Sequence, residues 1–156
     1  MHPTARAFVD EAEERYGLTP AVKEFDEGTK TAADAADAIG CEVAQIASSI
    51  VMVADGEVVV VVTSGANRVD EDRIAEVLDA DDVRMADPDE AKTATGWSIG
   101  GVPPICHESP VPVLFDETLL EHDQVWAAAG TPTAVWPIDP ERLRGLADAR
   151  PVAVAD

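Results

Sequence analysis

The sequence predicts one α+β domain, residues 1–156, whose mixed, largely antiparallel sheet curls around a single core. Two β-branched runs flank Asp55-Gly56, and an Asp-Gly pair in that setting is typical of a tight β-hairpin. Segments with helical periodicity are interspersed with hairpins, an order typical of α+β domains. The 156 residues suffice to bury a core without disulfides or metals, and no linker or internal repeat divides them.

The first forty residues predict two helices. A periodic apolar stripe indicates a helix over residues 3–16, which Gly17 would end. Thr31 can cap a second, alanine-rich helix, with Asp34 three residues further on, and Gly40 would close it. Between the helices we expect a short strand at residues 18–25 and a turn at Glu27-Gly28.

The central part of the chain carries the hairpin. Its two strands are expected at residues 49–54 and 57–63. The run Val58–Val62 lacks polar alternation, so both faces of the second strand should be covered. A turn then precedes further predicted elements: a helix at residues 70–78, a strand at 83–86, and a short helix at 88–92 that Pro88 would open.

A glycine- and proline-rich segment, Thr95–His107, opens the last part of the chain. Its three glycines allow close main-chain approach, and its two prolines remove amide donors. Such a segment can hold a ligand against main chain, or it can simply connect two elements tightly. After it we expect a strand at residues 111–115, a turn or short helix at 116–120, a hairpin of strands 124–129 and 133–136 around Gly130, and a helix at 139–146.

Composition restricts the classes of function. The chain has 31 acidic and 11 basic residues, a net charge of -20 that argues against a broad nucleic-acid groove but leaves a small local basic site open. A uniformly acidic, lysine-poor surface suggests a salt-rich cytoplasm, where repulsion is screened. There is no apolar leader, and the longest aliphatic run, Val58–Val62, is too short for a bilayer. We therefore expect a cytoplasmic protein with free thiols and no membrane partner.

The residues by themselves predict no catalytic constellation. Three His and two Cys lack the spacing of a metal site. Cys106 and His107 are adjacent, so on an extended chain they point in opposite directions, which disfavours a Cys-His nucleophile. No phosphate loop and no nucleophile elbow is found, and carboxylates are too numerous to single out a pair.

Short motifs succeed one another over residues 20–147. They are Thr31–Ala36 with Ile39-Gly40, Gln45-Ile46 with Ser49–Val51, Asp55-Gly56, Arg68–Asp70, Val83–Ala86, Thr95-Gly96, Gly100–Pro104, Pro112–Asp116 and Ala129-Gly130. In this order they resemble the YbaK/prolyl-tRNA-synthetase-associated domain family, freestanding editing domains that hydrolyse misacylated tRNA. The resemblance implies a curled, barrel-like mixed sheet surrounded by helices.

The resemblance also implies where a site would lie. Gly100–Pro104 would be the substrate loop, whose main chain holds the amino acid and the 3'-terminal adenosine of the tRNA close to a water. Catalysis would rest on Gly100, Gly101 and Ser48, without a covalent intermediate, metal or cofactor. Residues that would bind or brace the substrate are Ser49, Thr95, Gly96, Val102, Pro103, Pro104, Asp116 and Arg68.

One position departs from the family pattern. Many relatives have a lysine in the Gln-Ile-x-Lys-Ser stretch, where this chain has Ser48, which carries no charge. The leading hypothesis is an aminoacyl-tRNA deacylase acting in trans on a small wrong amino acid such as Ala, Ser or Cys, with tRNA-Pro as a candidate carrier. The alternative is a non-catalytic module that binds aminoacyl-tRNA or a synthetase. The implied partner is the acceptor end of the tRNA, and the oligomeric state is left open.

Overall fold

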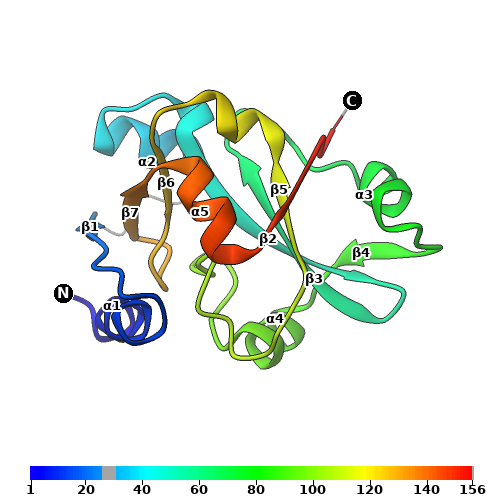
Figure 1. Ribbon diagram of the computed structural model, residues 1–156, viewed down its shortest axis with the longest axis horizontal. Coiled ribbons are helices and arrows are strands. Elements are labelled where there is room, and N and C mark those ends of the chain that lie inside the picture. Colours follow the sequence, from blue (N-terminus) through cyan, green and yellow to red (C-terminus); the bar gives the residue numbers. More distant parts are fainter. Residues whose placement is uncertain (26–30, 156) are drawn as a thin grey trace.

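The computed structural model describes residues 1–25 and 31–155, and its main feature is one mixed sheet (Figure 1). The sheet order is β1-β7-β6-β2-β3-β5-β8, with β4 also paired to β2. The strands are β1 Lys23–Glu24, β2 Ile46–Ala54, β3 Glu57–Ser64, β4 Val83–Met85, β5 Val113–Asp116, β6 Val125–Ala128, β7 Ala134–Ile138 and β8 Arg150–Val152.

Parallel and antiparallel pairings are both frequent in this sheet. β2/β3, β2/β4, β6/β7 and β1/β7 are antiparallel, whereas β2/β6, β3/β5 and β5/β8 are parallel. Because β1 and β8 end the order and do not pair with each other, the described sheet is open and not closed into a barrel. The α+β class and the mixed sheet are therefore confirmed, while the barrel-like curl stops short of closure.

The described α-helices lie where the sequence predicts helices, whereas the 3-10 helix η1 was not predicted. They are α1 Pro3–Tyr16, α2 Ala32–Ile39, α3 Glu71–Leu78, α4 Pro88–Thr95 and α5 Pro140–Ala147, with short 3-10 helices η1 Val43–Gln45 and η2 Glu117–Glu121. Thr31 Oγ1 accepts a hydrogen bond from the Asp34 N–H at 3.1 Å, and Gly17 and Gly40 end α1 and α2 in left-handed conformations. No described helix has the length and apolarity needed to cross a membrane.

The hairpin around Asp55-Gly56 joins β2 and β3. Ala54 is opposite Glu57, and both turn residues have positive φ, 49° and 85°, as a type I' turn requires. Both faces of β3 are covered, as predicted. Val60 and Val62 lie in the main core, and Val59 and Val61 lie in a second cluster beneath α3.

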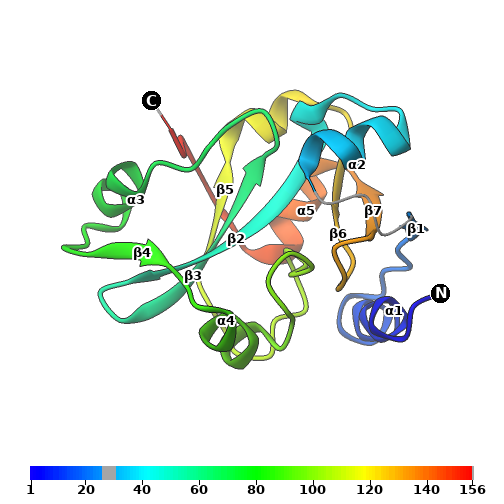
Figure 2. The same ribbon diagram turned by 180° about the vertical axis from the view of Figure 1, so that it is seen from behind.

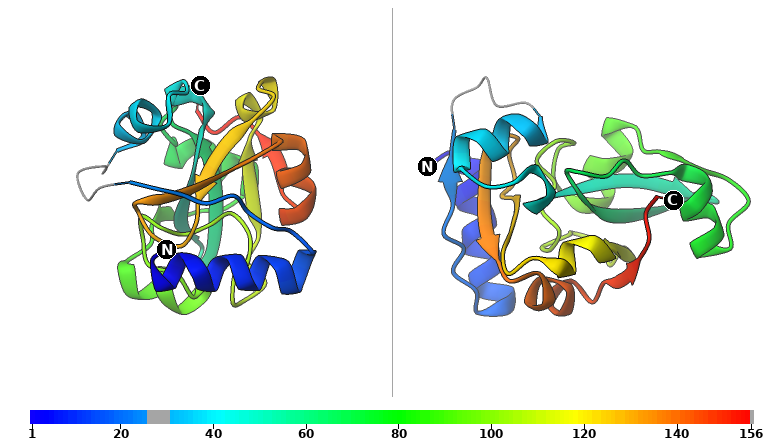
Figure 3. Two further views of the ribbon diagram at one scale, coloured as in Figure 1. Left: turned by 90° about the vertical axis from the view of Figure 1, so that its left-hand side faces the viewer. Right: turned by 90° about the horizontal axis from the view of Figure 1, so that it is seen from above.

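Aromatic packing ties the N-terminal helix to this scaffold. Phe8 of α1 is fully buried, with its ring centroid 6.1 Å from that of Trp97 and 5.5 Å from that of Trp136. Figure 3 shows α1 at one end of the molecule, next to β7. Seen from behind, α2 lies over β6 (Figure 2), where Ala35 and Ala36 pack near Trp126.

Several boundaries differ from the prediction. The strand expected at residues 18–25 is only Lys23–Glu24, since Pro20 has no amide donor for a ladder. β2 begins at Ile46 and α4 continues to Thr95, both beyond the predicted limits. β8 was not predicted, because three residues with a central proline carry no periodicity. The turn expected at Glu27-Gly28 lies outside the described residues.

Candidate functional site

The site begins with a gap in the pairing of β2. One edge of β2 pairs with β3 from Ala47 to Ala54 without interruption. The other edge pairs with β6 only at Ile46 and Ala47, and with β4 only from Met52 onward. On this edge, residues 48–50 pair with no strand, and Val51 O already accepts a hydrogen bond at 3.0 Å from the N–H of Ala86, which follows β4.

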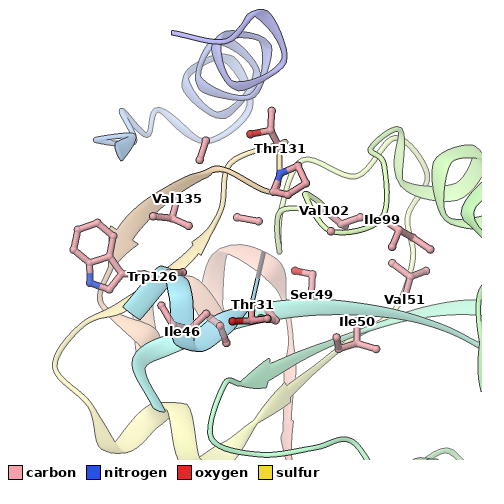
Figure 4. Close-up of a pocket in the computed structure, with 18 of the residues that line it drawn as sticks. Thr31, Ile46, Ser49, Ile50, Val51, Ile99, Val102, Trp126, Thr131 and Val135 are labelled. Carbon is pink, nitrogen blue, oxygen red and sulfur yellow. The ribbon is translucent and has the colours of Figure 1, made fainter. Parts of the chain in front are cut away.

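A pocket of about 290 Å³ opens at this gap (Figure 4). Five described parts of the chain supply its wall: β2, the start of α2, the end of β4, the Thr95–His107 loop, and the β6–β7 hairpin. The lining residues are Thr31, Ala32, Ala35, Ile46–Val51, Met85, Ile99, Gly100, Val102, Trp126, Ala128, Thr131, Pro132, Ala134 and Val135.

The lining carries no charge. Among the described residues that form it, no side chain is acidic, basic, histidine or cysteine, and the polar side chains are the hydroxyls of Thr31, Ser48, Ser49 and Thr131. Met85 and Ile99 belong to the lining and are 51% and 45% exposed, so they form an apolar rim. Such a pocket suits a small uncharged group, because an unpaired charge there would lose its hydration.

Two glycine contacts position the loop over the pocket. Gly101 accepts a hydrogen bond from the Gly130 N–H at 2.9 Å, and a Cβ on Gly101 would lie 2.6 Å from Thr131 Cα. A Cβ on Gly130 would lie 2.8 Å from a ring carbon of Trp97, and its φ is +99°. Only glycine fits at both positions, so the loop and the β6–β7 turn meet main chain to main chain.

The far side of the loop is held by buried hydrogen bonds. Thr95 Oγ1 donates to Ala91 O at 2.7 Å and accepts from the Trp97 N–H at 3.1 Å. The Trp97 indole N–H donates to Cys106 O at 2.9 Å, and His107 Nε2 lies 2.7 Å from Pro103 O. These contacts preorganise the loop, so that its Gly100 edge meets the pocket in one conformation.

The structure brings four of the predicted site residues to the pocket: Ser48, Ser49, Gly100 and Val102. Gly100 has φ +94°, and its N–H makes no hydrogen bond to another described residue. Gly101 does not line the pocket, and its N–H is engaged with Ser98 O at 3.0 Å. Its role in the structure is the contact with the β6–β7 turn.

The other predicted residues lie elsewhere. Thr95 and Gly96 end α4, and Pro103 and Pro104 are buried in the part of the loop that leads away from the pocket. Arg68 is exposed and outside the lining. The prediction that these residues contact substrate stays untested, and the positions of Thr95, Gly96, Pro103 and Pro104 favour support of the loop over contact.

Asp116 is a structural anchor in this geometry. Its carboxylate is 1% exposed and accepts hydrogen bonds from the Ser64 N–H at 3.0 Å and the Asn67 amide at 2.9 Å. The Thr118 N–H and hydroxyl donate to the other oxygen at 3.0 and 2.8 Å. Asp116 therefore joins the end of β3 to η2, away from the pocket lining.

Sequence reasoning missed the residues that other elements bring to the pocket. Thr31 was interpreted only as a helix cap, which it also is. Trp126, Thr131 and Pro132 come from the β6–β7 hairpin, which reaches β2 through a parallel pairing 80 residues along the chain, Ile46 with Trp126. Hairpin composition predicts the turn but carries no signal for that pairing.

Neither thiol has the lowered pKa of an activated nucleophile. Burial raises the pKa of the Cys106 thiol to about 12, and burial also lowers the pKa of His107, so that both groups stay neutral near pH 7. Burial raises the pKa of Cys41 as well. Within residues 1–25 and 31–155, no group of three His, Cys, Asp or Glu side chains could hold a metal ion.

Two described basic side chains, those of Arg84 and Lys92, are engaged with other groups. Arg84, next to the rim residue Met85, makes two hydrogen bonds to Glu90 at 2.8 and 2.7 Å, and these bonds hold the pKa of Glu90 at about 2. The Lys92 ammonium donates to Gly96 O at 2.9 Å. Many relatives have a lysine where this chain has Ser48. No other described residue of the lining provides a positive charge in its place.

The described residues thus form an α+β domain with an open mixed sheet and, at the edge of one strand, a pocket that a glycine loop covers and that no described charged side chain lines. The aminoacyl-tRNA editing domain family matches residues 26–146. The chain therefore belongs to this family, which confirms the resemblance seen in its motifs.

Individual relatives agree with this assignment. The proline–tRNA ligase of Lactobacillus johnsonii is 34% identical over 121 residues, which cover 78% of this chain and 21% of the ligase. The chain thus spans about a fifth of the length of that ligase. The uncharacterised protein YwhH of Bacillus subtilis is 28% identical over 123 residues, 78% of each chain.

A solved structure matches the whole fold. A protein proposed to be a trans-editing enzyme for prolyl tRNA synthetase superposes with a TM-score of 0.94 at 36% identity, covering 100% of this chain and 99% of the other. The open sheet described above is therefore the fold of that protein.

Proposed function

We propose that the protein is an aminoacyl-tRNA deacylase that acts in trans, with the pocket at the open edge of β2 as its active site. The observation that carries the proposal is the uncharged 290 Å³ pocket beneath Gly100, in a chain of the editing-domain family. Its size and lack of charge favour a small amino acid, such as Ala, Ser or Cys, and the similarity to proline–tRNA ligase favours tRNA-Pro as the carrier.

The reaction would be direct hydrolysis of the aminoacyl ester. A water oxygen adds to the ester carbonyl carbon, the bond from that carbon to the ribose oxygen then breaks, and the ribose hydroxyl receives the proton. No titratable side chain lines the described pocket, so positioning and main-chain donors carry the catalysis. The Gly100 N–H, which is unpaired, is our candidate donor to the oxyanion that develops on the carbonyl.

The acceptor end of the tRNA is the proposed partner. The apolar rim of Met85 and Ile99, with Trp126 in the lining, offers surfaces on which the terminal adenine can stack. A net charge of -20 repels the phosphates, so binding should be confined to the acceptor end and should need screening salt. A synthetase is a second candidate partner, suggested by the relatives.

A deacylation assay tests the proposal. The protein is incubated with Ala-, Ser- and Cys-charged tRNA at molar KCl, and hydrolysis above buffer is expected for at least one of them. Ile99→Asp, which places a negative charge on the exposed rim, should reduce the rate about tenfold or more through repulsion of the tRNA end. Val43→Asp is the matched control, since Val43 is also an exposed apolar residue but lies outside the lining.

Two results would count against the proposal. Absence of hydrolysis with all three substrates would overturn it, and measurable affinity for an aminoacyl-adenosine analogue without turnover would favour the alternative, a non-catalytic binding module. Equal losses of activity in Ile99→Asp and Val43→Asp would indicate that the activity does not depend on this pocket.

We also propose that the protein is adapted to a salt-rich cytoplasm. Its 31 acidic residues repel one another, and salt weakens that repulsion in the folded state. The midpoint of thermal unfolding is therefore expected to rise with KCl concentration from the millimolar to the molar range. A midpoint that does not change with KCl would contradict this.

A further inference from the structure

One polar side chain in the pocket lacks a partner. The hydroxyl oxygen of Ser49 is buried and makes no hydrogen bond with any described residue. Figure 4 shows Ser49 on β2, below Val102 of the loop. Burying a hydroxyl without a partner costs stability, so an orphan in a ligand pocket indicates that a ligand completes it.

The main chain of Ser49 is unpartnered as well. Opposite residues of antiparallel strands alternate between pairs that exchange hydrogen bonds and pairs that do not. The Gly65 N–H donates to Ile46 O at 2.8 Å, so the even-numbered residues of β2 bond to β3, and odd-numbered ones point the other way. The Ala86 N–H, which donates to Val51 O from the β4 side, agrees with this.

Ser49 therefore presents three free groups to the pocket. Its N–H and C=O point away from β3, into the stretch where neither β6 nor β4 pairs with β2. Its hydroxyl adds a donor and an acceptor on the face of the strand shared with Ala47 and Val51. No described residue of the lining forms a hydrogen bond with any of these three groups.

We infer that the open edge of β2 binds the aminoacyl group through main-chain hydrogen bonds, like those between paired residues of neighbouring strands. We infer further that Ser49 selects amino acids that carry a hydroxyl. This rests on the proposed function. An aminoacyl ester has an amine donor and a carbonyl acceptor on one carbon, the complement of the Ser49 C=O and N–H.

The geometry of strand pairing then places the side chain of the amino acid. Residues directly opposite each other on paired strands have Cβ atoms about 5 Å apart, on the same face. A seryl side chain opposite Ser49 would thus be within hydrogen-bond reach of the Ser49 hydroxyl. An alanyl group would fill the same space and leave that hydroxyl unpartnered, so the site disfavours it.

The test compares two amino acids on one tRNA. The wild-type protein should hydrolyse seryl-tRNA about tenfold faster than the same tRNA charged with alanine, in terms of kcat/KM. Ser49→Ala should bring this ratio close to one, because it removes the hydroxyl and leaves the main-chain edge intact. Ser109→Ala, an exposed serine outside the pocket, should keep the wild-type ratio.

A binding measurement separates this inference from the proposed function. Amide-linked seryl- and alanyl-adenosine cannot be hydrolysed, and calorimetry should give the same tenfold preference for the seryl analogue in wild type and its loss in Ser49→Ala. If neither tRNA is hydrolysed but the seryl analogue still binds tenfold more tightly than the alanyl analogue, the deacylase proposal fails. The proposed selection by Ser49 is then still supported. A wild-type preference for alanine, a ratio unchanged by Ser49→Ala, or no binding of either analogue would overturn the inference.

The same variant reports on folding. Since Ser49→Ala removes an unpartnered buried hydroxyl, its thermal midpoint should equal or exceed that of wild type. A marked drop in the midpoint would mean that the hydroxyl serves packing, and that result would contradict a role in selection.

Discussion

Replacing Gly101 by alanine is expected to lower the free energy of unfolding by about 3 kcal/mol, because the added methyl has no room. Its Cβ would lie 2.6 Å from Thr131 Cα and 2.7 Å from the carbonyl carbon and oxygen of Gly130. These are main-chain atoms, which cannot turn aside as a flexible side chain can. The loop must move away from the β6–β7 turn, and the hydrogen bond from the Gly130 N–H to Gly101 O is then lost.

The same displacement should open the roof of the pocket, so deacylation should fall together with stability. Chemical denaturation measures the loss of stability. The tRNA assay, at a temperature where the variant is folded, measures the loss of deacylation. Gly145→Ala is the matched control. It lies within α5 with open space around its Cβ, and there alanine should raise stability by about 0.5–1 kcal/mol. A Gly101→Ala protein as stable as wild type would show that the two main chains do not meet as described.

Replacing Asp116 by alanine is expected to destabilise the fold by about 3 kcal/mol or more, since a buried carboxylate and its four donors are lost together. The donors are the Ser64 N–H, the Asn67 amide, and the Thr118 N–H and hydroxyl, all within 3.0 Å of the carboxylate oxygens. Removing the acceptor takes the partner from the Ser64 N–H at the end of β3 and from the two Thr118 donors in η2, and it leaves the Asn67 amide with only Thr118 Oγ1.

Asp116→Asn separates shape from hydrogen bonding. The amide keeps the volume of the carboxylate but presents a donor to at least one group that already donates, so a loss of about 2 kcal/mol is expected. Asp123→Ala, at an exposed aspartate, should change stability by less than about 0.5 kcal/mol. If Asp116→Ala keeps full stability and loses only deacylation, Asp116 belongs to the substrate site and our structural interpretation is wrong.

Local elements were predictable because their causes are local. The Asp55-Gly56 turn, the Thr31 cap and the glycines that end α1 and α2 act over four residues or fewer, and each occurs as the sequence predicts. The short strands β1 and β8 depend on partners far along the chain. Their two or three residues carry no pattern strong enough to indicate a strand.

The predicted site was partly recovered. The motif resemblance indicated Gly100, Val102, Ser48 and Ser49, and all four line one pocket. The same resemblance grouped Asp116 with them, although its hydrogen bonds join β3 to η2. Motif matching cannot separate a residue that contacts a ligand from one that holds the scaffold, because a family retains both kinds.

By itself the sequence determined the α+β class, the central hairpin, the ends of α1 and α2, and the editing-domain family. The tertiary structure alone decided where the pocket lies, since β6 and β4 pair with opposite ends of one edge of β2 and leave residues 48–50 open between them. It also decided that no described residue partners the Ser49 hydroxyl there, and that Gly101 serves as a packing contact. The physical reason is that strand pairing and main-chain contact join residues dozens of positions apart, whereas composition and periodicity act only over neighbours.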